Sequence, residues 1–279
     1  MIARIRSALI DHGLVERAGD ILALARDGVR LEAHPVDGDL ATDASKLGGE
    51  PDVSADFVWP TWKNAQLAFL AQLNLAELRA FPECGILPPA GLLQFFYDTE
   101  QRTWGFDPKD RGSFLVRWEQ NIDGLHRARG GAANPACRVQ MRSESTIPAF
   151  ESSDYALLAL SPAEGDAYRN VWEVLGLEPT DGGTAHQVLG HAIPVQGDMQ
   201  VECQLVTNGL YCGDPSGYGD PRAAALRPGA RDWRLLFQLD SDEGAGLMWG
   251  DVGRLYFWMR EQDLSDGRFD RAWMQLQCA

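Results

Sequence analysis

Residues 186–205, HQVLGHAIPVQGDMQVECQL, contain side chains of the types that bind metals or transfer protons: His186, His191, Asp198, Glu202 and Cys203. Imidazole and carboxylate groups ligate zinc, and they also act as general bases and acids. The two histidines are five residues apart, so their side chains would diverge by about 140° on a helix and point to opposite faces of a strand. This spacing favours a strand, a turn at Gly190 and a second strand, with Asp198 and Glu202 on one face, over a metal site.

Two other segments resemble functional motifs but lack an essential residue. Residues 240–251, DSDEGAGLMWGD, begin like a calcium loop, yet the fifth position is Gly244 and the sixth is Ala245, where that loop needs glycine. A hairpin connection is therefore expected there. The Cys212 thiol lies in GLYCGDPSGYGDPRA without a nucleophile signature, so a buried thiol is expected.

Residues 103–114, TWGFDPKDRGSF, form a charged segment between apolar runs. Asp-Pro-Lys-Asp is favourable turn chemistry, so the segment is expected to join two strands. Its functional alternative is a recognition loop anchored by Trp104 and Arg111, because tryptophan and arginine are enriched at binding hot spots.

The composition excludes several function classes. The formal net charge of −15 disfavours binding to nucleic acid or to a membrane surface. The five cysteines form no C-x-x-C pair, which argues against a disulfide framework and for a reducing compartment. No signal peptide and no transmembrane run is recognised. We therefore expect a cytoplasmic protein without a cofactor or a metal; the sequence gives no oligomeric state.

The elements that must position these residues follow from hydrophobic spacing. Residues 1–33 are expected to form N-terminal helices, because Ile2, Ile5 and Leu9 recur at steps of three and four. PAEGDAYRNVWEVLG is expected to be a helix that starts near Pro162 and ends at Gly176. Most other apolar runs are short and aromatic, as in buried strands.

The chain also appears as two similar halves, residues 45–120 and 185–278. LAFLAQLN at 67–74 aligns with WRLLFQLD at 233–240, so that Gln72 matches Gln238. A glycine-led aromatic strand follows each, GLLQFFYD and GRLYFWMR, which pairs Phe95 with Phe257. An LG turn precedes each, at 47–48 and 189–190. The repeated order favours a duplicated unit, and chance similarity of apolar strands is the alternative.

From residue 45 to the end, the sequence resembles the YwqG-like bacterial proteins, a family of unknown function. The resemblance rests on the segments SKLGGEP, LAFLAQLNLAEL, LPPAGLLQFFYD, HQVLGHAIPVQGDM, LLFQLDSDEGAGLMWGDVGRLYFWM and WMQLQC. It implies an α+β fold with mostly antiparallel sheets built from two similar halves, and it supplies no reaction and no catalytic residues.

Two hypotheses of function remain. The first is a non-enzymatic binding protein that recognises a partner protein through its loops and an aromatic face. The alternative is a hydrolase or carbohydrate-binding enzyme that uses acidic residues beside Trp249. For either function, the ligand-contacting residues are predicted near the seam between the halves: His186, Gln196, Asp198, Trp249 and Asp251.

Overall fold

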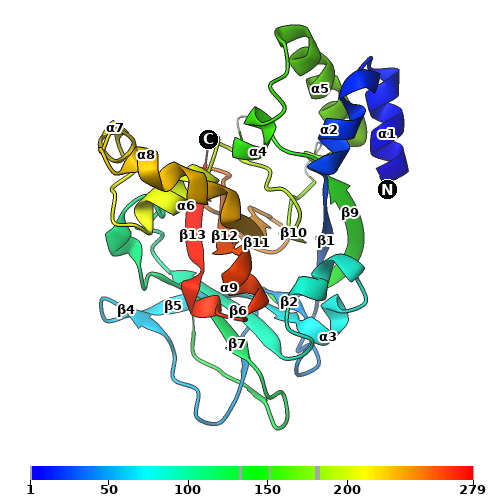
Figure 1. The fold of residues 1–279 in the computed structure, drawn as a ribbon. Helices are drawn as coiled ribbons and strands as arrows, with labels where there is room; N and C mark the ends of the chain where they lie inside the picture. Colours follow the sequence, from blue (N-terminus) through cyan, green and yellow to red (C-terminus); the bar gives the residue numbers. More distant parts are fainter. Residues whose placement is uncertain (1, 132–133, 151, 180–182, 279) are drawn as a thin grey trace.

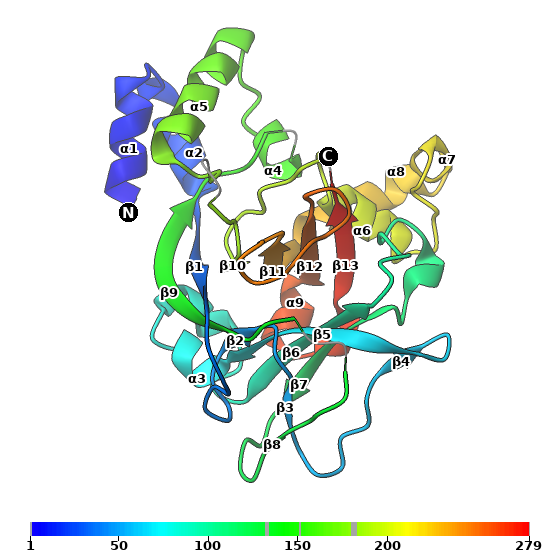
Figure 2. The same ribbon diagram turned by 180° about the vertical axis from the view of Figure 1, so that it is seen from behind.

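One curved antiparallel sheet dominates the fold of this α+β protein (Figures 1 and 2). The computed structural model describes residues 2–131, 134–150, 152–179 and 183–278. The strands of the sheet are β1 (Arg26–Pro35), β2 (Lys46–Leu47), β4 (Thr61–Trp62), β5 (Ala65–Asn74), β6 (Leu92–Asp98), β7 (Phe114–Glu119), β9 (Cys137–Thr146), β10 (Gln187–Leu189), β11 (Trp233–Asp240), β12 (Arg254–Arg260) and β13 (Trp273–Gln277). A separate ribbon pairs β3 (Asp52–Val53) with β8 (His126–Arg127).

The sheet bends into a nearly closed barrel. Its strand order is β13-β12-β11-β10-β1-β9-β2-β5-β6-β7, and β4 adds to β5. The two ends approach each other, because the Leu276 amide donates to the Trp104 carbonyl at 3.0 Å and the rings of Phe114 and Trp273 lie 5.3 Å apart. Every residue of β6 and of β13 is buried, as in strands that are covered on both faces.

Three helices form a layer at one end of the sheet, above the ends of β1 and β9 in Figure 1: α1 (Ile2–Asp11), α2 (Ala18–Ala23) and α5 (Pro162–Leu175). The helix predicted from Pro162 to Gly176 is confirmed. Ser161 and Glu164 form a capping box at its start, and Gly176 closes it with a positive φ of 61°. Leu9, Ile21 and Val171 share one apolar cluster, so the layer has a core of its own.

The prediction of helix over residues 1–33 is wrong from Arg26 onward. Residues 26–35 form β1, which pairs along its whole length with β9 and also with β10. Gly28 explains the close pairing, since a Cβ there would lie 2.9 Å from the amide nitrogen of Gly190. The burial of Val29 and Leu31 between two neighbouring strands outweighs their local helical spacing.

The remaining helices are short: α3 (Leu75–Leu78), α4 (Ser153–Ala156), α6 (Gln200–Val206), α7 (Pro215–Tyr218), α8 (Ala223–Leu226) and α9 (Glu261–Ser265). Of these, α3, α6 and α9 contact strands of the sheet. The second strand expected after Gly190 is wrong, because residues 200–206 form α6. Asp198 accepts a hydrogen bond from the Gln200 amide at the start of this helix. Within the described residues, no helix is long and apolar enough to cross a membrane.

The pairs β5–β6 and β11–β12 carry the same irregularity at the same place. In each pair the register shifts two residues before the aligned glutamine, between Phe69 and Ala71 and between Leu235 and Phe237. The residue opposite Ala71 is Phe95, and the residue opposite Phe237 is Phe257.

The two buried glutamines also make matching hydrogen bonds. Gln72 accepts from the Asp52 amide at 3.0 Å and donates to the Ala44 carbonyl at 2.9 Å. Gln238 accepts from the Ile193 amide at 2.9 Å and donates to the Ala185 carbonyl at 2.6 Å.

The predicted match of the two LG turns is out by one residue. Ala71 and Phe237 occupy the same position in the sequence alignment. Leu47 pairs with Ala71, but it is Val188, one residue before Leu189, that pairs with Phe237. The corresponding turns are therefore 48–49 and 189–190. All four residues have φ between 59° and 72°, including the non-glycine Leu189.

Candidate functional site

Two of the predicted site residues, His186 and Trp249, lie in the core. The ring of His186 is fully buried; its Nδ1 accepts from the Asp240 amide at 3.0 Å, and its Nε2 lies 3.2 Å from Asp242 Oδ2. Trp249 is 4% exposed and donates from Nε1 to the Asp240 carbonyl. Asp251, by contrast, lies exposed on the connection between β11 and β12. His186 and Trp249 therefore support the end of β11.

The other two predicted residues lie on the segment before α6. Asp198 Oδ2 accepts from the Ser153 hydroxyl at 2.6 Å, which ties this segment to α4. Gln196 donates from its backbone amide to Gln277 Oε1 at 3.0 Å, and it is exposed. Asp198 lines a small cavity together with His191, whereas His186 and Trp249 do not. The five predicted residues thus do not converge on one site.

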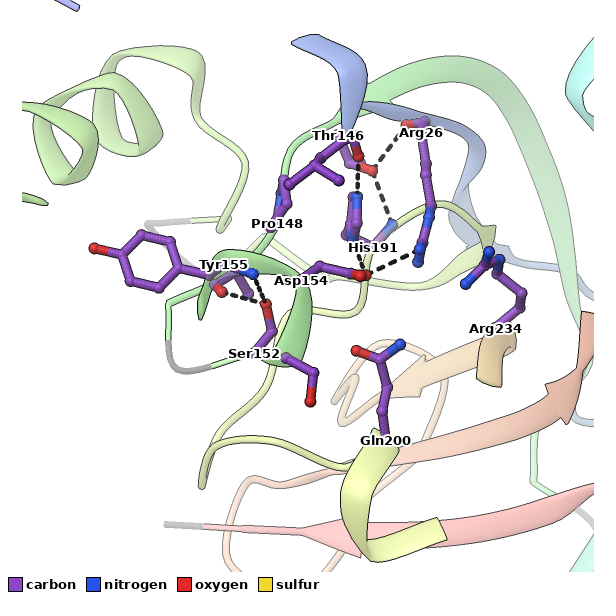
Figure 3. A network of polar contacts seen from close by, with 12 residues as sticks. Arg26, Thr146, Pro148, Ser152, Asp154, Tyr155, His191, Gln200 and Arg234 are labelled. Atoms are coloured by element: carbon purple, nitrogen blue, oxygen red, sulfur yellow. Dashed lines mark hydrogen bonds and ion pairs between the residues drawn. The ribbon is translucent and has the colours of Figure 1, made fainter. Parts of the chain in front are cut away.

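A buried polar network (Figure 3) borders the small cavity that Asp198 lines, and sequence reasoning missed most of this network. Asp154 on α4 lies 2.9 Å from Nη2 of Arg26, at the start of β1. Its Oδ2 is also 3.7 Å from Nδ1 of His191, which follows the 189–190 turn. The His191 amide donates to Thr146 Oγ1, and this hydroxyl donates to the Arg26 carbonyl. The network therefore joins β1, β9, α4 and the second half of the chain.

The surroundings of His191 fix its protonation state. Burial, and secondly the charge of Arg26, lower the pKa of His191 to about 3. The ring is neutral at physiological pH, and its Nε2 donates to the Leu24 carbonyl at 2.7 Å. A base with such a low pKa accepts protons poorly near neutral pH. The geometry therefore suits a role of His191 in orienting the 189–190 turn, rather than a role as a general base.

Arg26 and Asp154 carried no recognisable signal in the sequence. Arg26 fell inside the predicted N-terminal helix, and Asp154 fell in a short segment without a motif. Their contact is an ion pair between residues distant in the chain, which no local pattern encodes. Among the described residues, no group of three or more histidine, cysteine, aspartate or glutamate side chains could hold a metal ion.

Next to this network lies a cleft of about 580 Å³ between α5 and residues 193–197. Its wall includes Phe150, Trp172 and Val195, while Glu173 and Glu178 bring negative charge. The Arg169 guanidinium lies 4.9 Å from the centre of the Phe150 ring. Trp172 donates to the Pro148 carbonyl, so its ring is held in place. The cleft therefore has aromatic walls of fixed orientation and a volume within the range of ligand sites.

Two further hollows continue from the cleft past His191 and Gly190 toward β11 and α9. The small cavity at His191 shares Ala149, Pro194 and Gly197 with the cleft. A hollow of about 370 Å³ shares Arg26 and Gly190 with that small cavity. The polar network of Figure 3 thus lies between the two larger spaces.

These features define an α+β protein with a nearly closed antiparallel sheet and a cleft beneath its helical layer. The chain belongs to the family described as domain of unknown function (DUF1963), whose model matches residues 45–278. A comparison with curated proteins finds no match. The matched region excludes α1, α2 and β1, although β1 lies between β9 and β10 in the sheet. Arg26 therefore lies outside the family region, whereas Asp154, His191 and the cleft lie within it.

Proposed function

We propose that the protein is a binding protein, and that the cleft beside α5 receives a short segment of a partner protein. The observation that carries this proposal is the cleft of about 580 Å³ with Phe150, Trp172 and Val195 on its wall. Such walls suit an aromatic or long aliphatic side chain. Glu173, Glu178 and the net charge of −15 favour a segment that also carries basic residues.

The chemistry of the buried groups supports binding over catalysis. His191 is a weak base because its pKa is lowered to about 3 by burial and by Arg26. Burial, and secondly the charge of Glu202, raise the pKa of Cys212 to about 12, so the reactive thiolate is scarce at neutral pH. A hydrolase or carbohydrate-binding site around Trp249 gains no support, since that ring is enclosed in the core.

We also infer that the two halves derive from one duplicated unit. The support is threefold: matching glutamine hydrogen bonds, register shifts at the same aligned position, and adjacent residues with positive φ in both turns. Moving outward from β9 in the sheet, the strands β2, β5, β6 and β7 follow one another in chain order, as β10, β11, β12 and β13 do moving outward from β1. Of the two halves, the second contributes residues 193–197 to the cleft, while α5 on the opposite wall lies between the halves in the chain.

A random peptide library displayed on phage tests the binding proposal. Peptides selected on the wild-type protein should be rich in basic and aromatic residues. Val195→Asp and Glu173→Lys should each weaken the binding of a selected, fluorescently labelled peptide by at least about tenfold. A tenfold rise in Kd corresponds to a loss of about 1.4 kcal/mol of binding free energy. Fluorescence anisotropy measures the affinity.

The matched controls are Val15→Asp and Glu16→Lys, which make the same changes at exposed positions of the N-terminal layer that do not line the cleft. Their affinity should equal that of the wild type. The proposal fails if no peptide is selected, or if cleft and control variants bind the selected peptides equally well.

A further inference from the structure

Four arginines surround a hollow of about 400 Å³ on a chain with a strong net negative charge. Arg111, Arg260, Arg268 and Arg271 line it together with a single acidic residue, Asp263. Among the lining residues, four positive charges face one negative charge, and the carboxylates of Asp266 and Asp270, which pair with Arg268 and Arg271, reduce the local excess from three to one. Such a concentration focuses a positive potential in the hollow, opposite in sign to that of the whole molecule.

The hollow forms where the two ends of the curved sheet approach each other. Arg111 follows the 3-10 turn Pro108–Asp110 between β6 and β7, and Arg260 is the last residue of β12. Arg268 and Arg271 lie at the 3-10 turn Phe269–Arg271, which precedes β13. The arginines therefore come together only when the two ends of the sheet approach each other in the folded protein.

Arg111 and Arg260 have their guanidinium groups held in place without a counter-ion. The Arg111 guanidinium lies 4.8 Å from the centre of the Trp273 ring, and its Nη1 donates to the carbonyls of Asp270 and Ala272, each at 3.3 Å. The Arg260 guanidinium lies 5.4 Å from the centre of the Trp233 ring and donates to Gln204 Oε1 at 3.0 Å. In the part of the chain that the structure describes, neither forms an ion pair with a carboxylate.

The remaining charges of the hollow are already balanced in part. Arg268 is paired with Asp263 at 2.7 Å and with Asp266 at 3.0 Å, and Arg271 lies 3.6 Å from Asp270. Burial, and then the charge of Arg271, lower the pKa of Arg111, because both disfavour a cation that lacks a close counter-charge. An incoming anion would supply that charge.

We propose that this hollow binds an anion that carries phosphate groups, with Arg111 and Arg260 as its main donors. A guanidinium presents N–H groups in a planar fork that matches phosphate oxygens, and stacking on tryptophan fixes the plane of the fork. A volume of about 400 Å³ exceeds that of a single phosphate, so a diphosphate or an organic phosphate fits better. This site shares no lining residue with the cleft beside α5 and does not depend on its role.

Isothermal titration with inorganic pyrophosphate at low ionic strength tests the proposal. The wild-type protein should show one saturable site, and Arg111→Gln and Arg260→Gln should each weaken it by at least tenfold. Arg111→Lys, which keeps the charge but loses the fork, should give an intermediate affinity. The matched control is Arg129→Gln, the same substitution at a residue with a side chain 76% exposed and outside the hollow. It should bind like the wild type.

Three results would overturn the proposal. The first is the absence of saturable binding at millimolar pyrophosphate. The second is an equal loss in Arg129→Gln, which would show an effect of net charge alone. The third is acetate binding as tightly as pyrophosphate, which would identify a carboxylate site. Urea unfolding of each variant verifies the fold, and the variants Arg111→Gln and Arg111→Lys keep the test decisive if Arg260→Gln is unstable.

Discussion

Replacing Gln238 by methionine should destabilise the protein by about 2–6 kcal/mol. The Gln238 side chain is fully buried and satisfies two backbone groups, the Ile193 amide at 2.9 Å and the Ala185 carbonyl at 2.6 Å. Methionine has a similar size and shape but cannot bond to either. Each buried group left unpaired costs about 1–3 kcal/mol, and two of them give the stated range. That is a large part of the ~5–15 kcal/mol that typically stabilises a domain.

The same change at Gln72 should cost more. Gln72 bonds to the Asp52 amide and the Ala44 carbonyl, and its Nε2 also donates to the Asp52 carboxylate at 2.6 Å. A hydrogen bond to a charged group contributes about 1.5–3 kcal/mol. Gln72→Met should therefore be the less stable of the two variants.

Urea unfolding followed by circular dichroism measures both losses as shifts of the midpoint at an unchanged slope. Gln196→Met is the control, because Gln196 is exposed and its hydrogen bond to Gln277 comes from the backbone. Its stability should stay within about 0.5 kcal/mol of the wild type. Losses below about 1 kcal/mol in both Gln72→Met and Gln238→Met would refute the reasoning, because the matching hydrogen bonds would then contribute little in either half.

Three further predictions concern other buried groups. The pKa of His191 is about 3 in the folded chain and about 6.5 in the unfolded chain, so only the unfolded chain binds this proton between those values. Stability should fall by up to about 1.4 kcal/mol per pH unit as the pH drops through that window, and His191→Gln should flatten this dependence in pH-dependent urea unfolding; an unchanged slope would contradict it. Trp249→Ala should lower the free energy of unfolding by about 3–5 kcal/mol in thermal or urea unfolding, because the ring is buried. Asp251→Asn should change it by less than about 0.5 kcal/mol. A larger loss in Asp251→Asn than in Trp249→Ala would contradict the burial of Trp249. Asp52→Asn should cost about 3–5 kcal/mol because it leaves Lys46, 2.8 Å from the carboxylate, buried without its partner. In a double-mutant cycle with Lys46→Met, additive losses would show that the two side chains do not interact.

The candidate site was less accessible to sequence reasoning than the fold. Asp198, which the sequence predicts as a ligand-contacting residue, lines the small cavity at His191. The sequence predicts ligand contacts for His186 and Trp249, but both side chains lie in the core and form hydrogen bonds with the backbone of Asp240. Arg26 and Asp154 were missed because their ion pair joins a strand to a distant short helix. Arg111 was named as an anchor, whereas the other arginines of its hollow gave no local signal.

The sequence by itself determined the elements whose ends and partners are local. The helix α5 has its capping box and closing glycine within the segment, and the aligned strands around Gln72 and Gln238 share short apolar runs and a common order. The secondary structure of residues 26–35 and 200–206 depends on tertiary contacts that the sequence pattern does not show. The first became a strand because β9 and β10 bury it, and the second became a helix where a strand was expected. The arginine hollow likewise exists only because the sheet curves until its ends approach, bringing together charges that are distant in the chain.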